Sequence, residues 1–123
     1  MYELTVEMQF PAAHCIPEHP GRCARLHGHS YRTLITVAGN VLNAQGMMMD
    51  FGDLKAVCQH VVDPLDHQYL NDLPAFTDAV PTAEAIARYI YRQVRSQLPE
   101  HAGVQVARVV VYESERACAT YWE

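Results

Sequence analysis

The chain has 123 residues, of which half are apolar and 19% are charged, so its composition is that of one soluble globular domain spanning residues 1–123. A formal net charge of −5 argues against nucleic-acid binding. No apolar run approaches the roughly 18 residues of a membrane span, and the N-terminus lacks the basic and apolar regions of a signal peptide, so we expect a cytoplasmic protein with no membrane partner.

Two strands are predicted in the first third of the chain. Residues 2–10 alternate between apolar and polar side chains, which is typical of a half-buried strand, and Pro11 is expected to end its regular pairing. Residues 30–39 form the second predicted strand. The connection over residues 11–30 is too long to be only a turn, so we expect functional residues in it.

The centre of the chain changes to helical spacing. Apolar residues recur every three or four positions over residues 51–62, with Asp50 as the expected N-cap. A second helix is predicted to begin at Thr82 as its N-cap, to carry one apolar stripe and to end before Pro99. The connection over residues 63–80 is again long enough to carry function.

The last part of the chain returns to strand patterns, over residues 104–113 and 117–122. The order ββααββ predicts an α+β fold in which two helices cover one face of an antiparallel four-stranded sheet. The other face and the two edges of such a sheet would lack partners, and oligomerisation is the usual way to cover them.

The segment 23–29, CARLHGH, places one thiol and two imidazoles close together. His27 and His29 are separated by one residue, so in an extended backbone both imidazoles project from the same face. With His14, which follows the first strand, they form a candidate zinc site, and three histidines leave one coordination position open for water or substrate. The alternative is that these are unrelated surface or core residues. The other histidines are expected at the surface: His19, His60 and His101.

Cys23 has two interpretations that the sequence leaves open. As a fourth metal ligand it would close a structural site, although its spacing is not that of zinc fingers. As a reactive thiol it would be favoured as the thiolate by Arg22, Arg25 and a nearby metal. Residues 21–49 contain no acidic residue but carry these two arginines and Arg32, which indicates a small anionic ligand. All four cysteines are expected to be free.

Three further positions carry carboxylates of interest. Asp66 and His67 supply an acid and an imidazole in the second long connection; adjacent side chains do not naturally bond to each other, but both can line one pocket. The alternative is that Asp66 is a capping or turn residue after Pro64. Glu84 lies in the first turn of the second helix, where the helix dipole favours an acid. Glu113 ends an apolar strand, where it either meets solvent or accepts two N–H bonds from a ligand ring.

In chain order, these segments resemble the 6-pyruvoyltetrahydropterin synthase family, and within it the bacterial 6-carboxytetrahydropterin synthases of queuosine biosynthesis. The segments are FPAAH (10–14), CARLHGHSY (23–31), GMMMDFGDLK (46–55), LDHQYLN (65–71), PTAE (81–84) and VYES (111–114). The resemblance implies the tunnelling fold, with subunits assembled into a homo-oligomeric barrel of trimers or hexamers. It implies active sites between subunits.

The resemblance also implies roles for individual residues. These are Zn²⁺ binding by His14, His27 and His29, catalysis by Cys23, Asp66 and His67, and pterin binding by Glu113, with Thr82 and Glu84 near the pterin. The implied reaction converts 7,8-dihydroneopterin triphosphate to 6-carboxytetrahydropterin, with release of triphosphate and acetaldehyde. Candidates for triphosphate binding are Arg22, Arg25 and Arg32, with plain surface solvation as the alternative. Two other functions remain open: triphosphate elimination to 6-pyruvoyltetrahydropterin, and non-catalytic binding of a metal or pterin.

Overall fold

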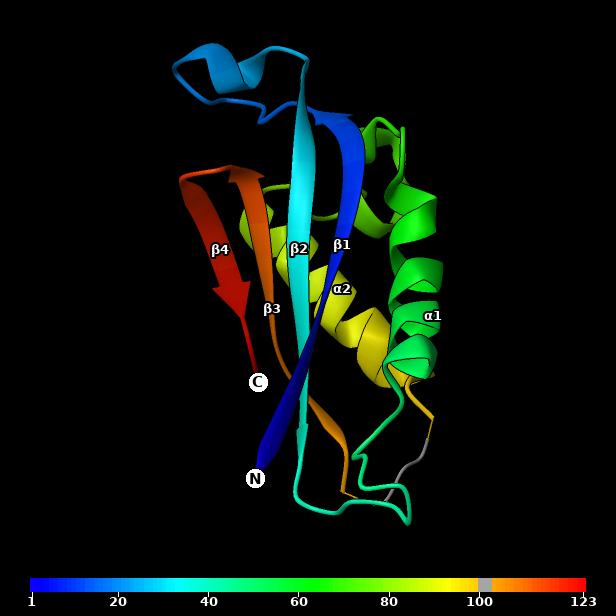
Figure 1. Cartoon of the computed structure of the whole chain (residues 1–123). Coiled ribbons are helices and arrows are strands. Elements are labelled where there is room, and N and C mark those ends of the chain that lie inside the picture. The colour runs from blue at the N-terminus through cyan, green and yellow to red at the C-terminus, as the bar shows by residue number, and fades with distance from the viewer. Residues whose placement is uncertain (100–102) are drawn as a thin grey trace.

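The computed structural model describes residues 1–99 and 103–123, and these form one four-stranded sheet and two α-helices (Figure 1). The elements are β1 (Tyr2–His14), β2 (His27–Gly39), α1 (Phe51–Val62), α2 (Ala83–Gln97), β3 (Gln105–Ser114) and β4 (Ala117–Tyr121). The strands are ordered β1-β2-β3-β4, and every neighbouring pair is antiparallel. Both helices cover the same face of the sheet, so the predicted α+β fold with the order ββααββ is confirmed.

The core lies between the sheet and the helices. Alternate residues of β1, among them Val6 and Phe10, are buried. α1 packs against β1, where it buries Leu54, and α2 packs against β3 and β4, where it buries Ile86 and Ile90. Neither of these helices combines the length and the apolar surface that a membrane span requires.

Both α-helices begin at their predicted N-caps. The Asp50 carboxylate accepts hydrogen bonds from the backbone N–H groups of Gly52 and Asp53, at 2.7 and 3.2 Å. The Thr82 hydroxyl accepts a hydrogen bond from the Ala85 N–H at 3.2 Å. These bonds satisfy N–H groups that the first turn of a helix otherwise leaves free, which is why the two cap residues fix the helix starts.

The prediction that Pro11 ends the pairing of the first strand was wrong. β1 continues through Pro11 to His14, and Pro11 lies opposite Ser30 of β2. The Pro11 carbonyl accepts a hydrogen bond from the His67 N–H at 2.7 Å, on the outer edge of β1. Because the N and O of one strand residue point to the same side, the N–H that proline lacks would also have faced this edge, and no bond to β2 is lost. β2 correspondingly starts at His27 rather than at residue 30.

The second long connection follows the outer edge of β1. It contains three short 3-10 helices, Asp63–Leu65, Leu70–Asp72 and Pro74–Phe76. In addition to the bond between His67 and Pro11, the Ala13 N–H donates to the Gln68 carbonyl at 2.9 Å. The connection therefore covers the C-terminal part of the β1 edge and fixes His67 to it.

Candidate metal centre and active site

Three histidines meet where β1 ends and β2 begins. His14 lies directly opposite His27 in the ladder, and His29 lies opposite Ala12. Each histidine offers one ring nitrogen, and these three nitrogens lie within 4.8 Å of one another. His14 is fully buried, whereas His27 and His29 are half-buried. The register of two antiparallel strands thus brings together the residues that the sequence suggested as a metal site.

The outer ring nitrogens of two of these histidines bind backbone carbonyls. The Nδ1–H of His14 donates to the Pro81 carbonyl, and the Nδ1–H of His27 donates to the Arg25 carbonyl, both at 2.7 Å. Because a carbonyl oxygen can only accept, Nε2 of each ring keeps its lone pair for a metal. Metal-ligating histidines in proteins usually have such an outer partner.

The spacing of the inner nitrogens suits one tetrahedral ion. Nε2 of His14 and Nε2 of His29 are 3.1 Å apart. Two nitrogens at about 2.0–2.1 Å from one tetrahedral zinc are about 3.3 Å apart. Burial lowers the pKa of His29, with the charge of Glu113 acting against this effect. A lowered pKa favours the neutral imidazole, which is the form that binds metal.

Glu113 lies beside this cluster. Its Oε1 is 3.9 Å from Nε2 of His14, and its side chain is 31% exposed. Burial and the charge of Glu113 together raise the pKa of Tyr31, whose ring packs edge-on against His14 and His29. Of the two environments considered for Glu113, the structure shows a carboxylate that adjoins the histidines and is still open to solvent.

Asp66 and His67 lie close together, but no hydrogen bond joins their side chains among the described residues. Nδ1 of His67 lies 3.0 Å from Oδ2 of Asp66. The backbone explains the contact: His67 has a φ of 57°, in the left-handed region, and this turn brings its ring back toward the preceding carboxylate. The two side chains are 77% and 43% exposed, respectively.

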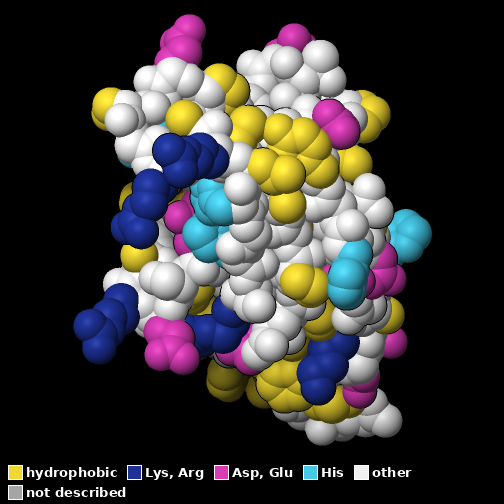
Figure 2. Space-filling view, turned by 90° about the horizontal axis from the view of Figure 1, so that it is seen from above, with side chains coloured by type: hydrophobic (Ala, Val, Ile, Leu, Met, Phe, Trp, Pro, Cys, Tyr) yellow, Lys and Arg dark blue, Asp and Glu magenta, His cyan; other side chains and the backbone are white. Residues whose placement is uncertain are grey.

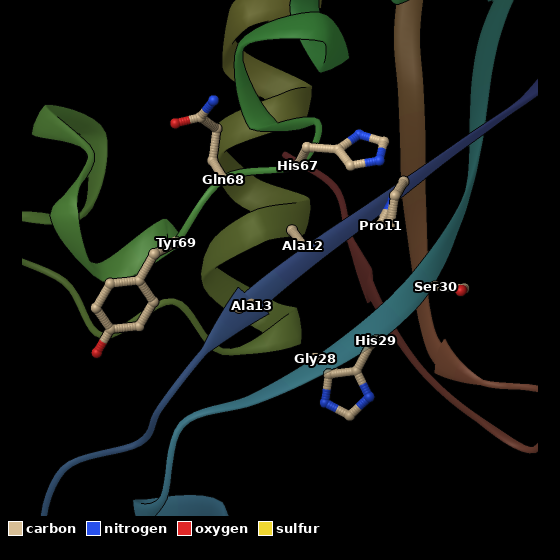
Figure 3. Close-up of a pocket in the computed structure, with 9 residues that line it drawn as sticks. All are labelled: Pro11, Ala12, Ala13, Gly28, His29, Ser30, His67, Gln68 and Tyr69. Atoms are coloured by element: carbon tan, nitrogen blue, oxygen red, sulfur yellow. The ribbon is translucent and has the colours of Figure 1, made fainter.

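His67 and His29 line the same pocket from different elements. Figure 3 shows the two rings with β1 between them in this view. The other residues of the pocket are Pro11, Ala12, Ala13, Gly28, Ser30, Gln68 and Tyr69. Neither Cys23 nor Asp66 is among the lining residues, so this pocket unites only part of the expected site.

Cys23 lies in the loop between β1 and β2, in the 3-10 helix Arg22–Ala24, and is half-buried. The four cysteines are free, as expected. Within residues 1–99 and 103–123, the only group that could hold a metal consists of the three histidines and does not include Cys23. Its catalytic role stays a prediction.

The predicted anion-binding arginines divide into two kinds. Arg22 and Arg25 are exposed. Figure 2, which views the molecule from above relative to Figure 1, shows basic side chains next to histidines. Arg32 instead donates to the Glu7 carboxylate at 3.1 Å and lies over the Tyr112 ring at 4.1 Å. Arg32 is therefore already paired on the open face of the sheet.

Two of the residues expected near the pterin lie at the start of α2. Thr82 caps α2 with its hydroxyl, and Glu84 is exposed in the first turn of that helix. His19 and His60 are exposed, as predicted, and His101 lies outside the described residues.

Sequence reasoning missed the side chain that connects the two long loops. The Asn71 amide accepts from the Cys15 N–H at 3.0 Å and donates to the Cys15 carbonyl at 2.9 Å. The Cys15 thiol also lies 3.1 Å from the Tyr69 hydroxyl. Asn71 was visible within the LDHQYLN segment, but no local pattern pairs it with a residue 56 positions earlier.

Known proteins provide an independent comparison. The sequence profile described as 6-pyruvoyl tetrahydropterin synthase matches residues 3–123. The chain belongs to this family. A 6-carboxy-5,6,7,8-tetrahydropterin synthase from Synechocystis is 41% identical over 128 residues, which cover 99% of this chain and 94% of that protein. Human 6-pyruvoyl tetrahydrobiopterin synthase is 39% identical over 97 residues, which cover 77% of this chain and 65% of the human protein.

Solved structures of the 6-pyruvoyl tetrahydropterin synthase family have the same fold. The Caenorhabditis elegans 6-pyruvoyl tetrahydropterin synthase matches with a TM-score of 0.85 at 27% identity, over 100% of this chain and 97% of that one. The family resemblance seen in the sequence motifs is confirmed. The protein is an enzyme of pterin metabolism.

Proposed function

We propose that this enzyme is a zinc-dependent lyase that converts 7,8-dihydroneopterin triphosphate and water to 6-carboxy-5,6,7,8-tetrahydropterin, triphosphate and acetaldehyde. The proposed setting is queuosine biosynthesis in the cytoplasm. The observation that carries the proposal is the three-histidine cluster, in which bonds at Nδ1 leave the lone pair of His14 and of His27 on Nε2. The name of the 41% identical Synechocystis relative supports the carboxy product.

The donor set fits zinc. Three neutral imidazole nitrogens are a common catalytic ligand set, and they leave the fourth position of a tetrahedral ion open. When bound, Zn²⁺ would supply Lewis-acid polarisation of the substrate's side-chain hydroxyls. His14, His27 and His29 would hold it, and Cys23 would remain a separate thiol.

Glu113 is the proposed anchor of the pterin ring. A carboxylate accepts two parallel N–H bonds from the amino-pyrimidinone edge of a pterin. Because Oε1 of Glu113 is 3.9 Å from Nε2 of His14, a ring bound there lies close to the histidines. Thr82 and Glu84 are proposed to lie near the same ring, which would put the start of α2 at the pterin site.

His67, Asp66 and Cys23 are the proposed acid–base groups. In the tautomer that carries its proton on Nδ1, toward the Asp66 carboxylate 3.0 Å away, His67 would have Nε2 free to accept a proton from the substrate side chain. The Cys23 thiol is the proposed partner that moves the second proton. Positioned acid–base groups of this kind contribute about 10²–10⁴-fold to a rate.

Arg22 and Arg25 are the proposed triphosphate ligands. Both are exposed in the loop that leads into His27, and residues 21–49 contain no acid that would repel phosphate. Guanidinium groups bind phosphate oxygens through two parallel N–H bonds. Arg32 is the weaker candidate because Glu7 already neutralises it.

We propose that a second copy of the chain completes the site, in a homotrimer or homohexamer. The supporting observation is that His67, at 77% exposure, stands on the outer edge of β1, where another subunit could enclose it. Co-expression of a His27→Ala chain with an Asp66→Asn chain tests this. Shared sites would restore part of the activity that each inactive variant lacks, and sites contained in one chain would not.

The decisive experiment is product analysis. Purified protein is incubated with 7,8-dihydroneopterin triphosphate, with added Zn²⁺ or after chelation, and the products are identified by mass spectrometry and an acetaldehyde assay. We expect 6-carboxytetrahydropterin and acetaldehyde only with the metal, and loss of turnover in Cys23→Ala.

The same experiment separates the other two functions. A pyruvoyl product without acetaldehyde would assign the activity of 6-pyruvoyl tetrahydrobiopterin synthase, the name of the 39% identical human relative. Binding of the pterin or of Zn²⁺ without any conversion would instead indicate a non-catalytic protein and would contradict the proposal.

A further inference from the structure

A buried hydrogen bond joins His14 to the start of α2. The Nδ1–H of His14 donates to the Pro81 carbonyl at 2.7 Å, and the His14 side chain is fully buried. Pro81 immediately precedes Thr82, the N-cap of α2. The bond decides which ring nitrogen of His14 carries the proton, because a carbonyl can only accept. The direction of one peptide group therefore determines whether Nε2 of His14 is available to a metal.

The peptide group between Pro81 and Thr82 is held on both sides. Its N–H donates to the Val80 carbonyl at 2.8 Å. Beyond it, the Thr82 hydroxyl accepts from the Ala85 N–H at 3.2 Å, and the Thr82 carbonyl accepts from the Ile86 N–H at 2.9 Å. These bonds hold Thr82 in the extended conformation of an N-cap, with φ −72° and ψ 166°. Because a peptide group is planar, fixing its N–H also fixes the Pro81 carbonyl.

We propose that Thr82 is a positioning residue of the metal centre: through the Pro81 carbonyl, it holds His14 in the tautomer that presents Nε2 to the ion. This inference rests on the proposed metal site and gives Thr82 a role besides proximity to the pterin. Outer partners of metal-ligating histidines contribute about 10- to 100-fold to metal affinity. Since Thr82 acts through one further group, the lower end of this range applies.

His27 provides a comparison within the same site. Its Nδ1–H also donates to a carbonyl, that of Arg25, at 2.7 Å. That carbonyl belongs to the residue after the short 3-10 helix Arg22–Ala24, which has no side-chain cap. Of these two ligands, only His14 has its partner carbonyl attached to a capped α-helix, so a single side chain can test the arrangement there.

Three variants test the inference. Thr82→Ala removes the capping hydroxyl, and Thr82→Ser keeps it. Asp50→Ala is the matched control, because it also removes one helix N-cap, that of α1. α1 begins far from the end of β1 that carries His14 (Figure 1). Zn²⁺ affinity is measured by competition with a chromogenic chelator. The tautomer of His14 is measured in metal-free protein by long-range ¹H–¹⁵N NMR.

We expect Thr82→Ala to weaken Zn²⁺ binding about tenfold, while Thr82→Ser and Asp50→Ala bind as the wild type does. Wild-type affinity in Thr82→Ala, or an equal loss in Asp50→Ala, would overturn the inference. If the wild type binds no Zn²⁺, the proposed metal site is wrong, and the tautomer decides the inference alone. The Nδ1–H form of His14 should then persist in Asp50→Ala and decrease in Thr82→Ala; an unchanged tautomer in Thr82→Ala would refute it.

Discussion

Replacing Asp66 with asparagine exchanges the carboxylate beside His67 for an amide of the same shape. In the wild type, Oδ2 of Asp66 lies 3.0 Å from Nδ1 of His67, and the side chains are 43% and 77% exposed. Even when both groups are charged, a contact this exposed contributes only about 0–1 kcal/mol to stability because water screens it. We therefore expect the free energy of unfolding of Asp66→Asn to stay within about 1 kcal/mol of the wild-type value.

The expected effect of Asp66→Asn on turnover is larger. The neutral amide offers Nδ1 of His67 either an oxygen or an NH₂ group, so it no longer selects the tautomer with a free Nε2. Since acid–base groups contribute about 10²–10⁴-fold, kcat should fall by at least about 100-fold. That loss is about 2.7 kcal/mol in activation free energy, which exceeds the stability change. KM should change less, because neither side chain is a proposed substrate ligand.

Steady-state kinetics and urea unfolding of the same preparations measure both quantities. Asp72→Asn is the matched control, because Asp72 is also exposed in the second long connection and is not part of the proposed site. A kcat of Asp66→Asn within about threefold of the Asp72→Asn value would refute the reasoning, because acid–base catalysis through this pair should contribute about 100-fold or more. A loss of activity that only parallels a loss of stability would assign Asp66 a structural role.

Four further outcomes are expected. Burial raises the pKa of the Cys58 thiol to about 12, so peptide mass spectrometry should find iodoacetamide labelling of Cys58 at neutral pH only after unfolding. Ile90→Ala should lower the free energy of unfolding by about 2–5 kcal/mol in urea titrations, because the side chain is fully buried. Glu113→Gln should weaken pterin binding about 10- to 100-fold in a fluorescence titration, because a charged acceptor is lost. Hydrogen bonds from Tyr121, Arg92 and Arg95 lower the pKa of Glu123 from 4.5 to about 2, so its stabilising effect is present above pH 4.5 and is lost as the pH falls toward 2. Glu123→Gln should therefore melt at a lower temperature than the wild type at pH 7, and the difference should vanish near pH 2.

The secondary structure was largely predictable because local patterns determine it. The apolar spacing and the Asp50 cap gave residues 51–62 as a helix, and α1 has these bounds. Thr82 likewise marked the start of α2. In such cases burial of one face and the capping bond act within a few residues, so neighbouring side chains carry the necessary information.

The error at Pro11 and the contact of His67 with Asp66 have a different origin. Whether a strand proline costs a hydrogen bond depends on which edge its N and O face, and that edge is defined only once β2 lies on the other side. The contact between Asp66 and His67 depends on the left-handed backbone at His67, which the bond from its N–H to the Pro11 carbonyl helps to hold. The first feature requires the pairing of Pro11 with Ser30, 19 positions later, and the second requires the bond between His67 and Pro11, which are 56 positions apart.

The histidine cluster was predictable only in part for the same reason. The spacing of His27 and His29 gives two imidazoles on one face, but the third nitrogen depends on the strand pairing that sets His14 opposite His27. The orientation of the His14 ring depends further on the Pro81 carbonyl, 67 positions away. Side chains of a site can thus be suggested by their types, whereas the backbone groups that orient them emerge only from the fold.

One register of β1 controls both parts of the proposed site. The pairing that sets His14 opposite His27 also turns the Pro11 carbonyl to the outer edge, where it accepts the His67 N–H. A slip of one residue would move His14 to the other face of the sheet and would turn the Pro11 carbonyl, with the missing N–H, toward β2. The histidine cluster and the attachment of His67 would then be lost together. Pro11 therefore disfavours that slipped register. In the observed register it can stand inside β1 because its missing N–H would have faced the outer edge, so no bond to β2 is lost.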